Sequence, residues 1–170
     1  MTDADLDTVG IGNAIVDVIS HADDALLLRH GLNKGTMTLI DAARADALYA
    51  MMGPAVEVSG GSAANTIAAL ASLGGNGAFI GKVRDDQLGA IFRHDITSLG
   101  ICFSTHAASE GPPTGRCLIF VTPDAERTMQ TFLGAGGYVG PEDVDEAVIA
   151  AARVTYLEGY LWDQPRAKQA

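Results

Sequence analysis

The feature of this sequence that most constrains its fold is a regular alternation between short apolar segments rich in β-branched residues and longer segments with helical character. Strands are predicted over residues 9–20, 36–40, 55–59, 78–83, 102–107, 115–122, 127–133 and 153–161. Helices are predicted over residues 22–30, 41–52 (with Asp41 as N-cap), 63–73, 85–100 and 140–152. Strands that alternate with helices of about 10 to 15 residues predict an α/β fold with a parallel sheet flanked by helices.

Some of the predicted strands follow one another without a helix between them. A smaller accessory sheet is the arrangement that uses such strands, since they cannot all be joined by helical crossovers. The candidates for this second sheet are the segments near 15–20, 36–40, 55–58, 115–122 and 127–133.

The composition limits what such a chain can do. Its 170 residues include 48% apolar residues, enough for a sizeable core, and disorder is not expected. The formal net charge is −10, and a nucleic-acid surface would need clustered Lys and Arg instead. A small anionic ligand stays possible, because a few local cations and helix N-termini can bind one.

The cysteines, histidines and N-terminus point to a cytoplasmic protein without a metal site. Cys102 and Cys117 are the only cysteines and form no CxxC pair, so we expect two buried thiols and no disulfide framework. The four histidines lack metal-ligand spacing. The acidic start MTDADLDT is unlike a signal peptide, and no apolar segment approaches membrane-spanning length.

Two polar residues interrupt the apolar segment 9–20. On a strand, Asn13 and Asp17 would point to the same side, and polar groups in a buried strand need partners. A carboxylate and an amide together suit the adjacent hydroxyls of a sugar. A straight strand would separate the two residues by roughly 13 Å, so the chain must bend if both touch one ligand. Capping or turn roles are the alternative.

A glycine pair precedes the predicted helix 63–73. Gly60 and Gly61 permit close backbone approach, Ser62 is a candidate N-cap, and Asn65 falls on the first turn, where it could face a ligand. A simple strand–turn–helix junction explains the glycines and the serine equally well.

The glycine-rich segments do not match nucleotide-binding motifs. GIGNAI, from Gly10, has Ile15 where a dinucleotide fingerprint has its third glycine, and no GxxxxGK[ST] is present. The segment GAGGYVG (134–140) is explained by a loop before the helix that Pro141 begins.

Five motifs in a fixed order make the chain resemble the N-terminal half of the ribokinase-like (PfkB) carbohydrate kinase family, and within it the adenosine kinase branch. They are GNAIVD (12–17), GGSAANT (60–66), GKVRDDQLG (81–89), PTGRCLIFV (113–121) and ARVTYLEGY (152–160). The resemblance implies a Rossmann-type parallel sheet with a small β-sheet lid. It also implies phosphoryl transfer from ATP, with Mg, to a hydroxymethyl group of a nucleoside or sugar.

The same resemblance implies roles for individual residues. Asp17 would bind the vicinal hydroxyls of the acceptor, and Arg127 matches a lid arginine near the transferred phosphate. The other polar contacts would come from Asn13, Gly60, Gly61, Ser62 and Asn65, and the apolar pocket from Ile15, Met37, Leu39 and Cys117. Ribokinases place a sugar-binding glutamate near Tyr160, whereas Glu158 is predicted to lie on the other phase of its strand.

The resemblance also implies that a part of the family domain is missing. The DTxGAGD segment with the catalytic base and the NxxE motif do not occur, and GAGG at 134 is not followed by Asp. We therefore expect residues 1–170 to be the acceptor half of one domain, truncated before its nucleotide-binding half and inactive alone. A non-catalytic sugar- or nucleoside-binding or regulatory module is the alternative, and a homodimer through the lid or an exposed sheet edge is possible.

Overall fold

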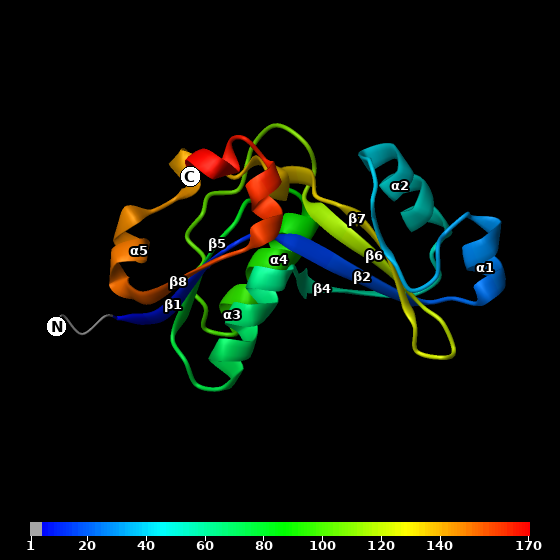
Figure 1. The fold of residues 1–170 in the computed structure, drawn as a ribbon, viewed down its shortest axis with the longest axis horizontal. Coiled ribbons are helices and arrows are strands. Elements are labelled where there is room, and N and C mark those ends of the chain that lie inside the picture. Colours follow the sequence, from blue (N-terminus) through cyan, green and yellow to red (C-terminus); the bar gives the residue numbers. More distant parts are fainter. Residues whose placement is uncertain (1–4) are drawn as a thin grey trace.

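The structure, a computed structural model that describes residues 5–170, contains two sheets. The first is parallel and has three strands in the order β5 (Gly77–Ile80), β1 (Leu6–Ile11) and β8 (Ala152–Leu157). Two of its strands, β1 and β8, come from opposite ends of the described chain, and Figure 1 shows them side by side at one end of the molecule. This mixed α/β architecture with a parallel sheet agrees with the fold class predicted from the sequence.

The second sheet has five strands, in the order β3 (Met37–Leu39), β7 (Arg127–Phe132), β6 (Gly115–Val121), β2 (Ile15–His21) and β4 (Ala55–Gly60). Of these, β6 and β7 follow each other directly, while α1 (Asp24–Arg29) and α2 (Ala42–Met51) separate β2, β3 and β4 along the chain. The central pair β2 and β6 is parallel, with Ile15 beside Gly115 and Asp17 beside Cys117. The β2–β4 and β6–β7 pairs are antiparallel. The sheet is therefore mixed, and alternate residues of each strand face its two opposite sides.

Helices cover both faces of the three-stranded sheet, because α3 (Ser62–Ser72) packs with Phe79 whereas α5 (Glu146–Ala151) packs with Val9, Ala78 and Ile80, whose side chains point the other way. Both α3 and α5 contact β1, whereas α4 (Gln87–Ser98) packs on β2 and β4. At the other end of the molecule, α2 contacts β6 and β7, with α1 nearby (Figure 1). The remaining helices are short 3-10 turns, η1 (Gly134–Tyr138), η2 (Pro141–Asp143), η3 (Gly159–Asp163) and η4 (Ala167–Gln169).

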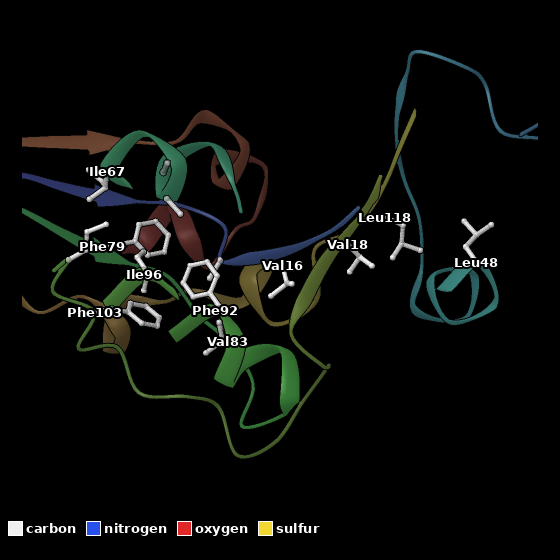
Figure 2. Packing of buried hydrophobic residues seen from close by; sticks show 14 of the residues in the cluster. Val16, Val18, Leu48, Ile67, Phe79, Val83, Phe92, Ile96, Phe103 and Leu118 are labelled. Atoms are coloured by element: carbon white, nitrogen blue, oxygen red, sulfur yellow. The ribbon is translucent and has the colours of Figure 1, made fainter. Parts of the chain in front are cut away.

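One continuous core runs under both sheets. Phe79, Phe92 and Phe103 pack with ring centroids 5.4–5.9 Å apart, in the range typical of favourable aromatic pairs. The same cluster continues through Val16 and Leu118 on the five-stranded sheet (Figure 2). Because close-packed cores resist deformation, this cluster fixes the two sheets relative to each other.

Local sequence signals predicted several helix starts correctly. The Asp41 carboxylate accepts from the backbone N–H of Arg44 at 2.8 Å and caps α2. At α4 the cap is Asp86, which accepts from Gly89 N–H. Ser62, in contrast, is not the N-cap of α3: that position is Gly61, with φ 103°, and Ser62 is the first helical residue.

Three predicted elements are corrected. The segment 9–20 is two strands in different sheets, because the chain bends at residues 12–14. The segment 102–107 pairs only through Cys102 and Ala78, since the guanidinium of Arg93 takes the carbonyls of Phe103 and Thr105. The helix predicted over 140–152 is divided into η2 and α5, whose N-cap is Asp145.

None of the helices formed by residues 5–170 combines the length and the apolar character needed to cross a membrane.

Candidate functional site

A cavity of about 400 Å³ lies where the bend between β1 and β2 meets the five-stranded sheet. It is lined by strands of the five-stranded sheet, the bend before β2, the beginning of α3 and the segment after β8. The lining residues are Asn13, Ile15, Met37, Leu39, Gly61, Ser62, Met129, Thr131, Leu133, Glu158, Tyr160 and Gln164. Six of these residues were predicted from the sequence, and one of them, Asn13, stands in the bend at residues 12–14 between β1 and β2.

The wall of the cavity on the sheet side is apolar. Ile15 on β2, Met129 on β7 and Leu39 on β3 line it together with Met37. Leu39 is 59% exposed and Met37 47% exposed. Large apolar side chains gathered around a cavity are typical of ligand-binding surfaces.

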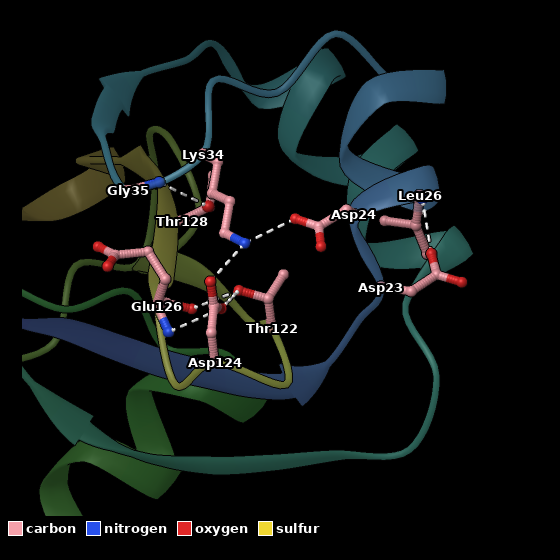
Figure 3. Close-up of polar contacts among 9 residues, drawn as sticks. All are labelled: Asp23, Asp24, Leu26, Lys34, Gly35, Thr122, Asp124, Glu126 and Thr128. Atoms are coloured by element: carbon pink, nitrogen blue, oxygen red, sulfur yellow. Dashed lines mark hydrogen bonds and ion pairs between the residues drawn. The ribbon is translucent and has the colours of Figure 1, made fainter.

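Lys34 ties the segment before β3 to the rest of the sheet. Its ammonium group lies 2.7 Å from the carboxylates of both Asp24 and Asp124, which come from α1 and the β6–β7 turn (Figure 3). Next to it, Gly35 N–H donates to the hydroxyl of Thr128. These contacts fix the start of β3, and with it the apolar side chains that β3 places at the cavity.

The polar end of the cavity is organised by Glu158. This carboxylate is buried, at 6% exposure. Its Oε1 accepts from the backbone N–H and the side-chain amide of Asn13, and its Oε2 accepts from the hydroxyl of Ser62 and the N–H of Ala63. The strand β8 ends at Leu157, so the alternation that was predicted to turn Glu158 away no longer applies at residue 158.

Asp17 lies on the same face of β2 as Ile15, two residues along the strand. Burial raises the pKa of this carboxyl from 3.8 to about 6, while the positive charge of Arg127 acts in the opposite direction. Among residues 5–170 no group donates a hydrogen bond to it. A half-buried carboxylate without a donor is costly, and a ligand with hydroxyl groups would supply the missing donors.

Gly60 and Gly61 make room for the polar groups of the site. An added Cβ on Gly60 would come within 2.5 Å of the Asp17 carboxylate. On Gly61, which has φ 103°, it would meet the carbonyl oxygen of Asn13. Both glycines therefore serve close approach between β2, its preceding bend and the start of α3.

Cys117 lies beside Asp17 on β6 and is buried. The hydroxyl of Thr131, which lines the cavity, donates to its Sγ at 3.3 Å. Burial raises the pKa of the thiol to about 11, with the hydrogen bond from Thr131 acting against this and the Asp17 charge adding to it. The thiol is therefore neutral at physiological pH and acts as an apolar group.

Five of the predicted site residues do not line the cavity itself: Asp17, Gly60, Asn65, Cys117 and Arg127. Arg127 is at the far end of β7, on the face that Met129 and Thr131 share. Asn65 is exposed on the first turn of α3. Asp17 and Cys117 thus lie next to the cavity, on the same face of the five-stranded sheet, and do not line it.

The glycine-rich segment 134–138 is not a phosphate cradle. It forms η1, in which the N–H of Ala135 donates to Pro113 O and that of Gly136 donates to Leu133 O. A phosphate site needs free N–H groups. In the part of the chain that the structure describes, no three His, Cys, Asp or Glu side chains gather as metal ligands. The N–H groups of η1 therefore do not fit a nucleotide phosphate, and the described side chains do not fit a protein-ligated Mg.

Comparison with known proteins identifies the family. Residues 38–169 match the family described as pfkB family carbohydrate kinase. The chain belongs to this family. The match extends from β3 to η4 and so includes most of the residues around the cavity.

Solved structures of kinases have the same fold as this chain, and curated kinase sequences are similar to it. The adenosine kinase from Sinorhizobium meliloti is 58% identical with a TM-score of 0.91, over 98% of this chain and 51% of that one. A probable sugar kinase protein from Rhizobium etli is 54% identical with a TM-score of 0.91, over 100% and 51%. An ATP-dependent ribose-1-phosphate kinase from Halopiger xanaduensis is 37% identical over 98 residues, 58% of this chain and 33% of that protein. The chain thus spans about half the length of the two solved structures and about a third of the length of the Halopiger xanaduensis kinase.

Half of the residues that line the cavity were not predicted from the sequence. Met129, Thr131 and Leu133 alternate on β7 and could have been found from strand periodicity once the face of β7 was known. Glu158 carried another signal, because a lone carboxylate within the apolar segment VTYLEGYL needs buried partners. Tyr160 and Gln164 follow the end of β8, where no periodicity guides a prediction.

Proposed function

We propose that this chain is the acceptor-binding half of an ATP-dependent kinase of the pfkB family. Its substrate is a nucleoside of the adenosine type or a related sugar, phosphorylated on a hydroxymethyl group. The observation that carries this proposal is the pairing of an apolar cavity with the Asp17 carboxylate, which lacks a donor among residues 5–170. A sugar diol provides two donors, and a carboxylate can accept both.

The shape and chemistry of the cavity favour a nucleoside over a free sugar. Apolar side chains of Ile15, Met37, Leu39 and Met129 and the ring of Tyr160 surround it. A flat base would bury its faces against such groups, whereas a free sugar carries hydroxyls on all sides and would leave them unpaired. The name of the Sinorhizobium meliloti relative, an adenosine kinase, points the same way.

We propose that the ATP and magnesium sites of the whole enzyme lie outside residues 5–170. Those residues contain neither a free N–H cradle in η1 nor a group of metal ligands. The described residues bind and orient the acceptor and shield it from water. We therefore expect the 170-residue chain alone to bind acceptor without measurable phosphorylation.

A thermal-shift and calorimetry panel tests the substrate class. The 170-residue chain is titrated with adenosine, other nucleosides, ribose, fructose phosphates and inositol. We expect saturable stabilisation by adenosine or another nucleoside and none by the smaller sugars. Stabilisation by no compound would contradict the acceptor-site proposal, and a preference for a sugar or sugar phosphate would replace the nucleoside assignment.

Asp17→Asn is the matching variant. It keeps the size of the side chain but removes the charge that accepts two hydroxyl donors, so the stabilising shift should be lost while the ligand-free protein stays folded. Asp46→Asn, at an exposed aspartate on α2 that pairs with Arg116, is the control and should keep the shift. A normal shift in Asp17→Asn would remove this residue from the site.

A further inference from the structure

We propose that Glu158 is a positioning residue of the acceptor site: it holds the bend at Asn13 and the first turn of α3 in place at the cavity and does not bind the ligand itself. The role of this orientation in binding rests on the proposed function above. The orientation itself is a property of the ligand-free chain and can be tested without any ligand.

The contacts of Glu158 join three parts of the fold. Residue 158 follows β8, Asn13 stands in the bend between the two sheets, and Ser62 and Ala63 begin α3. The distances from the carboxylate oxygens to their four donors are 2.6–3.2 Å. Two donors reach each oxygen, so the acceptor capacity of the carboxylate is used by the protein. A ligand hydroxyl would have to displace one of them.

Gly12 leaves the space that the Glu158 carboxylate occupies. An added Cβ on Gly12 would lie 2.6 Å from Glu158 Oε2 and 2.6 Å from the Cβ of Ala63. Any larger side chain at residue 12 would therefore force the carboxylate away from α3. The bend, the glycine and the glutamate form one packed unit.

Glu158 also decides which end of the Asn13 amide faces it. An ionised carboxylate only accepts hydrogen bonds, so it must face the amide nitrogen. The amide oxygen then points the opposite way, against Gly136, where it is buried and has no hydrogen-bond partner among the described residues. The Asn13 amide is thereby fixed in one orientation, with its nitrogen on Glu158 and its oxygen against Gly136.

Exchanging the two functional groups tests this assignment. Glu158→Gln places an amide against the Asn13 amide and the Ala63 N–H, and Asn13→Asp places two carboxylates together. Each variant should weaken adenosine binding by about tenfold or more and lower the thermal midpoint, because a buried charged hydrogen bond is lost. The combination of the two restores a carboxylate–amide pair, so most of both losses should be recovered.

Two controls separate positioning from other effects. Glu146→Gln, at an exposed glutamate in the first turn of α5, should leave both measurements unchanged. A dideoxy analogue of adenosine, which lacks both ring hydroxyls, should lose much less affinity than adenosine in Glu158→Gln. A purely structural role would weaken both compounds equally.

These experiments distinguish a failure of the Glu158 positioning role from a failure of the proposed nucleoside-binding function. If the wild-type chain binds no nucleoside, the proposed function fails, and the thermal midpoints of the four proteins still test the Glu158–Asn13 pairing. Losses that simply add in the combined variant would overturn the positioning role. So would an unchanged adenosine affinity in Glu158→Gln, or an equal loss for the dideoxy analogue.

Discussion

Gly60 on β4 lies diagonally opposite Asp17 on β2, so close to its side chain that a Cβ atom on Gly60 would stand 2.5 Å from the carboxylate carbon of Asp17. No Cβ atom tolerates that distance, and the carboxylate would have to move. Gly60→Ala should therefore destabilise the fold by about 1–3 kcal/mol, as overpacking does. It should also abolish the stabilising shift from nucleoside. Urea unfolding and thermal shift measure the two effects.

The control for this variant is Gly53→Ala. At Gly53 an added Cβ would meet only the Ser20 hydroxyl, at an ordinary contact distance of 3.7 Å. Its unfolding free energy and ligand response should match the wild type closely. A Gly60→Ala protein that behaves like this control would show that the Asp17 carboxylate does not need its present position.

Gly61→Ala should be more damaging than Gly60→Ala. The residue has φ 103°, and its Cβ would come 2.3 Å from the carbonyl oxygen of Asn13, which is backbone and cannot rotate away. Backbone strain and overpacking together predict a loss of about 2–5 kcal/mol in the free energy of unfolding. Urea unfolding of both glycine variants gives the ranking, and the reverse order would refute this account.

Local chemistry made the strands, the division into two sheets and most helix starts predictable from the sequence. The apolar, β-branched composition of β2 and β6 and the capping carboxylates of Asp41 and Asp86 act within a few residues of the element that they define. The errors have causes that are distant in sequence. The β1–β2 bend depends on Gly12 packing against Glu158, and the strand predicted over 102–107 loses its carbonyls to Arg93.

The same distinction applies to the candidate site. Asn13, Ile15, Met37, Leu39, Gly61 and Ser62 belong to motifs that could be recognised, and they line the cavity. Glu158 was expected to point away because strand periodicity was extended one residue past the end of β8. The partners of Glu158 are 95 to 145 residues away along the chain, and no local pattern encodes such contacts.

Lys34→Met should weaken nucleoside binding a few-fold without unfolding the chain. The substitution removes the two contacts that hold the segment before β3 to α1 and to the β6–β7 turn, so Met37 and Leu39 lose their fixed positions at the cavity. Exposed ion pairs are screened by salt. Wild-type affinity should therefore fall toward that of Lys34→Met in high salt. Arg153→Met, at an exposed residue 3.8 Å from Asp7, is the control, and an equal effect there would contradict this role.

The pKa of Asp17 gives the site a pH dependence with a defined sign. Burial raises this pKa from 3.8 to about 6, so the folded state holds its proton more tightly than the unfolded state. The contribution of Asp17 to stability is therefore present below about pH 4 and lost as the pH rises through 6, by roughly 3 kcal/mol at most. Ligand binding has the opposite dependence, because only the ionised carboxylate accepts two hydroxyl donors. Affinity for adenosine should fall as the pH is lowered through 6.

Calorimetry between pH 4 and 8 and urea unfolding over the same range measure both trends. In Asp17→Asn the group no longer titrates, so the part of each trend that Asp17 supplies should disappear. The carboxylate of the wild-type protein can also be followed directly by carbon NMR. A midpoint near the ordinary value of 3.8 would mean that the carboxylate is better solvated than its place beside Gly60 and Cys117 indicates, and would contradict both predicted trends.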